Sequence, residues 1–456
     1  MASTISSSNS HKLQRYHMVD MKDMISDLPE GILYYILSRL STEEAVRTSI
    51  LATKWRYLWT QLPVFDFRDS SPKRNSKSPD CLVDLVDQLL HKSNRIKKLF
   101  IELPVTIVDA GKVSSMLSSA LMHDVHDLTL NLESENSRFV LPNSFSASRS
   151  LTKLDIVFGF LDSVPDGICF PSLKILSFAH VTFTNEKSAQ RLFSGCPVLQ
   201  DLSFEKCYWV NINISVAIPT LKKLDIFFRS SSLDRNSCMF KIDAVNLLSL
   251  SYKSNPTINC FLVNSTSIVD ANIDLGFFCV QNNELHVAVF AIELFSRLGS
   301  VESLRLSDQT IQCLNYAKSA LHLLPSFKNL TRLEVHFDDP SCEVLADILR
   351  KSPKLEFLHI YGGSYLSLDS EDWTSDSLPC CFKSSLKSCD ISDFRGDEAE
   401  IRLVKFLLEN VTLLREMNIY CTGYLSKKSK KLADVRNQLQ ALGMGSCVIN
   451  LHHSWF

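Results

Sequence analysis

Histidine and cysteine are the residues of this chain best suited to hold a metal ion or to act as nucleophiles. The sequence has 12 histidines and 14 cysteines, with close groupings at His123 and His126 and at His452 and His453, near Cys447. A structural zinc site uses spaced ligand pairs such as Cys-x-x-Cys, which the sequence lacks. "LMHDVHDL" (121–128) is more typical of a helix end followed by a strand. We therefore expect no metal, with a zinc site at either grouping as the minor alternative.

The familiar signatures of catalysis are also missing from the sequence. It contains no Gly-x-x-x-x-Gly-Lys-Ser/Thr loop, no Gly-x-Ser-x-Gly elbow and no His-Glu-x-x-His helix. An enzyme in its own right is thus the less favoured hypothesis. We expect a non-catalytic protein without a cofactor, whose chemistry is the binding of partners.

The composition and charge of the chain indicate which classes of partner to expect. The formal net charge is −2 and the sequence pI is near 6.6, whereas a nucleic-acid-binding domain is usually strongly basic. Scattered cysteines suit reduced thiols in the nucleus or cytoplasm, and no apolar run is long enough to span a membrane. The first twenty residues lack the apolar run of a secretory signal, although their Ser-rich, acid-poor composition leaves a transit peptide as an alternative.

The elements that would present a binding surface follow one apolar spacing from residue 95 onward. The order is apolar, two others, apolar, one other, apolar, as in "PSLKILSF" (171–178), "PVLQDLSF" (197–204), "PTLKKLDI" (219–226) and "PKLEFLHI" (353–360). Weaker copies begin at Ile96, Val125, Leu151, Leu247, Ile268, Val301, Leu330, Leu386 and Leu414. Neighbouring copies lie roughly 21–33 residues apart, close to or somewhat above the period of leucine-rich repeats.

Each copy fits one short strand of a repeat array. The last two apolar residues alternate, so they point to one face of a strand, while the first lies at the turn into it. One such unit cannot bury its apolar face alone, so the copies must stack into a solenoid. Only "LQDLSFEKCYW" (199–209) carries the full leucine-rich-repeat signature. We therefore expect an irregular solenoid, with an ordinary α/β core as the alternative.

In such an array, the side chain between the two inward residues of each strand faces the concave surface. These side chains are Thr129, Asp155, Ser177, Ser203, Asp225, Ser251, Asn272, Arg305, Glu334 and His359. Our candidates for target binding are Ser177, Ser203, Asp225, Ser251, Arg305, Glu334 and His359. No basic cluster among them would bind a phosphate, and "KKSKK" (427–431) is predicted to be a solvated loop.

The residues before the repeats predict a compact unit of three helices. Asp27 is the expected cap of the first helix, and Ser41 with Glu44 forms a capping box for the second. The apolar residues that follow the helical spacing in the first and third helices are Leu33, Ile36, Leu37, Leu40, Trp55, Leu58, Trp59 and Leu62. So small a unit cannot bury them all, and we expect the two tryptophans and a leucine pair to remain partly exposed, as a patch that marks a protein interface.

Residues 25–67 resemble the F-box of plant F-box proteins. The resemblance rests on Leu28-Pro29, the Ile36-Leu37 pair, "AVRTSIL" (45–51) and Trp55-Arg56-x-Leu58-Trp59, although Thr53-Lys54-Trp55 stands where lysine-arginine-tryptophan is usual. It implies docking on the Skp adaptor of a Skp–cullin–F-box ubiquitin ligase. The residues expected at that interface or in its immediate support are Leu28, Pro29, Ile32, Leu33, Ile36, Leu37, Leu40, Trp55 and Leu58.

The segment from Glu371 to Ile419 is similar to the FBD module that follows an F-box and leucine-rich repeats in plants. Its residues predict a strand, a turn at Gly396, a helix with an Asp397–Glu400 capping box, and a last strand. The predicted apolar positions are Ile401, Val404, Leu408 and Val411 on the helix, and Leu414, Met417 and Ile419 on the last strand.

Together these observations predict an α/β protein in which a small three-helix F-box is followed by an irregular leucine-rich-repeat solenoid and a C-terminal FBD module. The expected divisions are a tail (1–24), the F-box (25–67), a linker and first helix (68–92), the repeats (93–370) and the FBD (371–450). The resemblance implies the substrate-recognition subunit of a ubiquitin ligase, whose partners are a Skp-family adaptor, through it a cullin, and an unknown protein substrate. No nucleic acid or membrane is expected, and the alternative is a repeat scaffold that works without ubiquitin.

Overall fold

A computed structural model describes most of the chain. The described residues are 24–67, 79–93, 96–103, 110–132, 138–157, 159–209, 213–227, 238–254, 258–264, 266–276, 284–337, 343–362, 378–442 and 447–453. Most of the predicted tail, and residues 68–78 of the predicted linker, lie outside them. Within the described ranges, no helix has the length and apolar character needed to cross a membrane.

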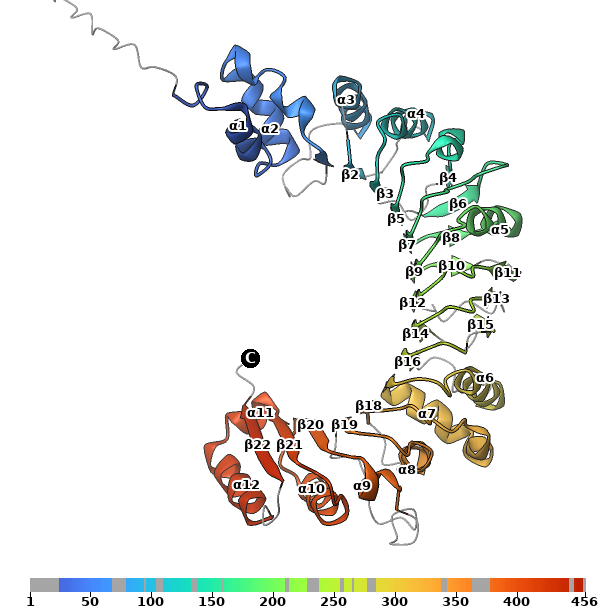
Figure 1. The fold of residues 1–456 in the computed structure, drawn as a ribbon, viewed down its shortest axis with the longest axis vertical. Coiled ribbons are helices and arrows are strands. Elements are labelled where there is room, and N and C mark those ends of the chain that lie inside the picture. The colour runs from blue at the N-terminus through green and yellow to red at the C-terminus, as the bar shows by residue number, and fades with distance from the viewer. Residues whose placement is uncertain are drawn as a thin grey trace, which may run out of the picture.

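A single curved sheet of 15 parallel strands lines the inner face of an arc (Figure 1). The strands follow the order β1 (Val64–Phe67), β2 (Lys98–Leu103), β3 (Asp127–Leu132), β5 (Lys153–Val157), β7 (Ile175–Ala179), β9 (Asp201–Glu205), β12 (Lys223–Phe227), β14 (Ser249–Ser254), β16 (Asp270–Leu275), β17 (Ser303–Leu306), β18 (Arg332–His336), β19 (Phe357–Tyr361), β20 (Ser388–Phe394), β21 (Glu416–Cys421) and β22 (Val448–His453). Each strand pairs with the next along the chain within this sheet, as a solenoid requires.

Helices and two small sheets cover the outer face of the arc (Figure 1). The helices after the N-terminal unit are α3 (Pro79–Lys92), α4 (Ala110–Leu121), α5 (Glu186–Ser194), α6 (Glu284–Ser296), α7 (Asp308–Tyr316), α8 (Glu343–Arg350), α9 (Cys381–Ser384), α10 (Glu398–Asn410), α11 (Gly423–Ser426) and α12 (Ser429–Leu442), with 3-10 turns η4 (Asn143–Ala147) and η6 (Lys318–Leu323). The small sheets are β10-β8-β6-β4 (Tyr208–Trp209, Thr182–Phe183, Phe160–Ser163, Arg138–Val140) and β11-β13-β15 (Asn213–Ala217, Cys238–Asp243, Ile258–Val263).

The repeated apolar spacing sets the register of the main sheet. Leu176, Leu202 and Leu224 are direct partners on β7, β9 and β12, and all three are buried. A shift of one residue would turn every leucine from the core to the solvent, so the register is strongly specified. The predicted solenoid is thus confirmed, and every copy of the spacing, strong or weak, coincides with a strand of the main sheet.

The N-terminal unit differs from the three predicted α-helices. Helix α1 (Glu30–Leu37) has Pro29 at its N-cap position, two residues after the predicted cap at Asp27. Helix α2 (Thr42–Arg47) has the predicted capping box, in which Ser41 N donates to Glu44 Oε2 at 3.0 Å. It continues as η1 (Thr48–Ile50), and the third segment is two 3-10 turns, η2 (Thr53–Trp55) and η3 (Leu58–Gln61), rather than one α-helix.

The helical unit is joined directly to the sheet. Strand β1 pairs with β2, so the sheet begins before the segment that we predicted to be a linker. Phe65 on β1 packs edge-on against Trp59 at 6.2 Å between ring centroids, and both side chains are buried. The N-terminal unit and the solenoid therefore share a core.

The C-terminal module continues the same sheet. Gly396 has φ +69°, a left-handed turn that glycine adopts readily, and Glu400 Oε2 accepts from Asp397 N at 3.1 Å, as in the predicted capping box. Of the predicted apolar positions, Val404 and Val411 are buried while Ile401 and Leu408 are half-buried against the core, and the buried face of α10 also includes Glu400, Leu403 and Leu407. Strand β22 follows β21, which corrects the prediction that Met417 and Ile419 belong to the last strand.

Candidate protein-binding sites

The N-terminal unit carries an exposed apolar surface, but its members differ from those predicted. Leu33, Leu37, Trp55 and Leu58 are at most 6% exposed and belong to the same buried core as Trp59 and Phe65. These four residues can support an interface but cannot contact a partner in this conformation. The other predicted interface residues lie nearer the surface: Leu28 and Ile36 are half-buried, while Pro29, Ile32 and Leu40 are exposed.

Sequence reasoning missed the most exposed apolar side chains of this unit. They are Met24, Ile25, Tyr35, Ile50, Leu51 and Tyr57, of which Ile50 is 88% exposed and Leu51 65% exposed. Ile50 and Leu51 end η1, and Tyr35 lies on the outer side of α1. In a sequence, such residues can be recognised as apolar residues at positions that do not follow the periodic spacing of the buried helix face. Exposed apolar surface of this extent on one small unit is typical of a protein interface.

Lys54 and Trp55 fasten the third segment to the entrance of the unit. Lys54 Nζ donates to the carbonyls of Ser26 at 2.6 Å and Leu28 at 3.0 Å, and Trp55 Nε1 donates to Ser26 Oγ at 2.9 Å. The lysine at position 54, where an arginine is usual in the resembled subfamily, thus has a direct structural role. It orients the start of α1 and the exposed residues beside it.

On the docking role that the F-box resemblance implies, we expect Lys54→Met to weaken capture of a Skp-type adaptor without unfolding the solenoid. The methionine keeps most of the aliphatic stem but loses two charge-assisted hydrogen bonds, each of which contributes about 1.5–3 kcal/mol at most and less at so exposed a site. Titration of the variant with a Skp-type adaptor should show several-fold weaker binding. Lys92→Met, at the exposed end of α3, is the control, and equal affinity of both variants would contradict this role.

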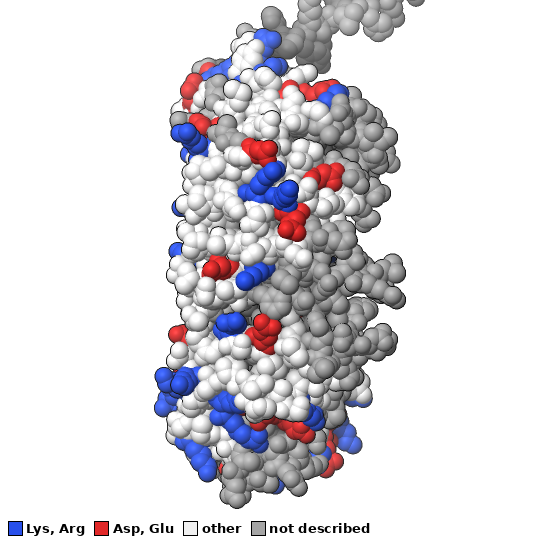
Figure 2. All heavy atoms as spheres, turned by 90° about the vertical axis from the view of Figure 1, so that its right-hand side faces the viewer, with Lys and Arg blue, Asp and Glu red and all other residues white. Residues whose placement is uncertain are grey.

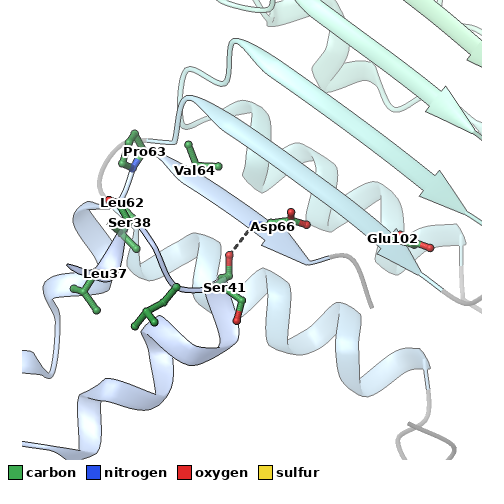
Figure 3. A pocket seen from close by; sticks show the side chains of 10 residues that line it. Leu37, Ser38, Ser41, Leu62, Pro63, Val64, Asp66 and Glu102 are labelled. Atoms are coloured by element: carbon green, nitrogen blue, oxygen red, sulfur yellow. Dashed lines mark hydrogen bonds between the residues drawn. The ribbon is translucent and has the colours of Figure 1, made fainter. Parts of the chain in front are cut away.

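A cleft of about 590 Å³ lies where the N-terminal unit meets the sheet (Figure 3). Asp66 N donates to Thr42 Oγ1 at 2.7 Å across its wall, which ties β1 to α2. Its lining is Leu37, Ser38, Leu40, Ser41, Thr42, Leu62, Pro63, Val64, Asp66 and Glu102. The exposed Leu40 and Val64 extend the apolar surface from the helices toward the first strands.

The concave face presents one continuous row of residues from strand to strand. All ten residues predicted for this face are aligned by direct pairing, from Thr129 on β3 through Asp225 on β12 to His359 on β19. The row continues into the C-terminal module with Asp390, Asn418 and Asn450. The pairing therefore brings the seven candidate target-binding residues into one line.

The first half of the concave face is neutralised by its own ion pairs. Lysines and aspartates alternate there, with Nζ–Oδ2 distances of 2.7 Å for Lys98–Asp127, 2.8 Å for Lys153–Asp155 and 2.7 Å for Lys223–Asp225. Exposed pairs of this kind contribute little free energy. Because of these ion pairs, this part of the concave surface carries positive and negative charges in similar numbers, and neither sign dominates.

The second half of the concave face is rich in aromatic and histidine rings. Arg305 Nε donates to Glu334 Oε2 at 2.8 Å, and the Arg332 guanidinium lies 4.2 Å from the centre of the Phe357 ring. Beyond them, rings from β18, β19, β21 and β22 form one stack: His336, Tyr361, His359, Tyr420 and His452. Tyrosine, phenylalanine and arginine are the side chains that interface cores favour.

The outer face is less distinctive. Figure 2 shows lysine and arginine side chains intermixed with aspartate and glutamate among a majority of other residues.

The segment "KKSKK" (427–431) was predicted to be a loop, but α12 begins at Ser429 within it, and Lys431 pairs with Asp397 at 2.9 Å. In the part of the chain that the structure describes, no group of three or more histidine, cysteine, aspartate or glutamate side chains could hold a metal ion.

A small helical unit joined to an arc of stacked parallel strands defines a protein of the repeat-solenoid class. Comparison with family models gives the same parts in the same order. The F-box domain model matches residues 25–67, the model for the LRR repeats of FBD-associated F-box protein At5g56370 matches 113–272, and the FBD model matches 375–419.

Curated relatives resemble the chain over nearly its whole length. F-box/LRR-repeat protein At3g59210 of Arabidopsis thaliana is 30% identical over 92% of this chain and 91% of its own. F-box/LRR-repeat protein At4g14096 is 28% identical over 94% and 95%, and F-box/FBD/LRR-repeat protein At5g53840 is 29% identical over 94% and 96%, both from the same plant. The chain belongs to the F-box/LRR-repeat family, in the form that carries an FBD module.

Proposed function

We propose that this protein is the substrate-recognition subunit of a Skp–cullin–F-box ubiquitin ligase. The observation that carries the proposal is the pairing of an F-box, whose apolar side chains remain exposed, with a long concave sheet. Residues 25–67 dock on a Skp-family adaptor, which connects the chain to a cullin. The repeats of residues 93–370, with the C-terminal module of residues 371–450, hold the target protein, and a separate conjugating enzyme performs the ubiquitin transfer.

The shared core of the F-box and the sheet supports this division of labour. Because β1 belongs to the sheet and Asp66 is hydrogen-bonded to Thr42, the docking unit cannot swing freely against the solenoid. A target on the concave face is then held in a fixed place relative to the adaptor. The chain would thus contribute to ubiquitin transfer by positioning the target, and its own residues would perform no chemical step.

The chain is proposed to work in the nucleus or cytoplasm. Its described cysteines are free thiols, and burial raises the pKa of Cys196 and Cys207 to about 12. Such thiols are inert packing groups in a reducing compartment.

Affinity purification of the tagged chain under proteasome inhibition tests the proposal. A Skp-type adaptor and a cullin should co-purify, together with a target whose abundance rises. The purified complex should then ubiquitinate that target when the conjugating enzymes are added. Adaptor and target that co-purify without any ubiquitin transfer would favour the alternative of a repeat scaffold, and an absent adaptor would contradict the docking role of residues 25–67.

A further inference from the structure

The five-ring stack on the concave face has one opening. The ring centroids of His336 and Tyr361 are 4.0 Å apart, those of Tyr361 and His359 are also 4.0 Å apart, and those of Tyr420 and His452 are 4.7 Å apart. Between His359 and Tyr420 the distance is 6.4 Å and the planes are inclined by 36°. The stack is therefore tight on both sides of a wedge.

The wedge exists because strand β20 contributes no ring to the stack on the concave face. Its residue at this level is Ser392, whose Oγ lies at hydrogen-bonding distance, 2.8 Å, from His359 Nε2. The pairing of β20 with β21 shifts after Ile391, and Asp393 adopts φ +58°. This irregularity lies beside the strand position of Tyr420, and bulges commonly redirect side chains near functional sites.

A carboxylate forms the floor of the wedge. Asp390 lies on β20 between Cys389 and Ile391, which both point into the core, so its side chain points to the concave face. It is only 9% exposed, and its Oδ1 accepts from Asn418 Nδ2 at 2.9 Å. Within the described residues, no lysine or arginine forms an ion pair with Asp390. Burial lowers the pKa of the neighbouring His359, which disfavours the charged imidazolium that could otherwise partner Asp390.

The ligand that best suits this site is a cation. A buried carboxylate without a cationic partner is costly, and a cation near ring faces is attracted by their quadrupoles. Arginine fits better than lysine, because its planar guanidinium stacks on rings while its N–H groups donate to a carboxylate. Among the other charges that act on these rings, Asp393 and Glu416 are carboxylates, whereas Arg305 and Arg332 both lie against Glu334, at 2.8 Å and 4.0 Å.

We propose that the wedge between His359 and Tyr420, with Asp390 as its floor, is a receptor for an arginine side chain of the target protein. The guanidinium lies across the opening, contacts the rings of His359 and Tyr420, and donates to the free oxygen of Asp390. This inference rests on the proposed function and names the chemistry of the target at one point. It also makes the C-terminal module part of the target-binding surface.

Peptide libraries test the receptor on the full chain in complex with a Skp-type adaptor. Immobilised octapeptides carry arginine, lysine or citrulline at a fixed centre, with the other positions randomised among non-basic residues. Citrulline keeps the size and planarity of arginine without its charge. The arginine library should retain about tenfold more protein than the citrulline library, as one charge-assisted hydrogen bond predicts. Equal retention, or preference for citrulline, would overturn the proposal.

Two variants and two matched controls locate the effect. Asp390→Asn keeps an oxygen for Asn418 but removes the charge, and Tyr420→Leu removes a ring that is 39% exposed. Asp155→Asn on β5 and Phe227→Leu on β12 make the same changes at equivalent positions of the concave row, where Phe227 is 38% exposed. Retention of the arginine library should fall about tenfold for the first pair only. Equal loss in both pairs, or loss in neither, would contradict the assignment.

Adaptor binding separates failure of this inference from failure of the proposed function. If the adaptor co-purifies and the arginine preference is missing, the receptor is refuted while the ligase role stands. If the arginine preference is present in the isolated chain but no adaptor binds, the ligase role fails while the receptor stands. Circular dichroism of each variant verifies that the solenoid is folded.

Discussion

Replacing Ile50 and Leu51 together with aspartate should abolish binding of the Skp-type adaptor. Both side chains are exposed in the free chain, at 88% and 65%, so neither supports the fold. Burying two such side chains in an interface contributes roughly 3–6 kcal/mol, which corresponds to about a hundredfold to ten-thousandfold in affinity. Two carboxylates in the same place would add a desolvation cost. Calorimetric titration of the purified variant with adaptor measures the loss.

The control for this variant changes exposed apolar residues elsewhere on the chain. Leu323 and Leu413 are 58% and 45% exposed and belong to the solenoid and the C-terminal module. Leu323→Asp with Leu413→Asp should leave adaptor affinity unchanged. Undiminished binding by the Ile50/Leu51 variant would remove this edge of the F-box from the interface. Substitution of Leu28 and Pro29 is a less direct test, because Leu28 packs on the core and Pro29 precedes the first turn of α1.

Phe204→Ala should have the largest effect on stability. Phe204 is 1% exposed at the centre of an aromatic cluster, with its ring centroid 5.8 Å from Phe178, 5.9 Å from Phe193 and 5.5 Å from Trp209. Removal of a buried phenylalanine ring typically costs about 3–5 kcal/mol, because a cavity is left behind. In denaturant titration, the variant should therefore begin to unfold at a lower denaturant concentration than the parent protein.

The loss should be local, because a solenoid repeat contacts mainly its neighbours. Hydrogen exchange should accelerate in β7, β9 and β12 and remain nearly unchanged in β20 and β21. Phe227→Ala on the neighbouring strand is the control: its side chain is 38% exposed on the concave face, and its loss should cost less than about 1 kcal/mol. Uniform acceleration along the whole arc would contradict the neighbour-to-neighbour picture.

The strands of the arc could be predicted because their signal is periodic and local. The spacing seen in Leu173, Leu176 and Phe178 fixes both the existence of a strand and the side that faces the core. The row on the concave face follows from the same alternation, and Thr129 to His359 are aligned as the pattern requires. Strand β22 has a weaker pattern, and the two small outer sheets have no repeated spacing at all, so neither could be read from the sequence.

The exposed surface of the F-box was harder to predict than its core. Helical spacing selects residues that pack, and Leu33, Leu37 and Trp55 are indeed buried. We expected the tryptophans to remain partly exposed because three short helices lack the volume to bury them. That expectation was wrong because β1 brings Phe65 against Trp59 from outside the helical unit. The ring stack was equally invisible in the sequence, since its members come from four separate strands.

The unbroken parallel pairing of the main sheet sets the distance along the concave face between any two of its strands. Strand β20, with Asp390, is twelve strand intervals from β1, and at about 4.8 Å per interval the path along the concave face is about 58 Å. The curvature turns the two ends of the arc toward the same side (Figure 1). Inserting or deleting one whole repeat would shift the far end by about 5 Å and also rotate it. The number of repeats, and not only the residues on them, would then decide which part of a bound target faces the adaptor.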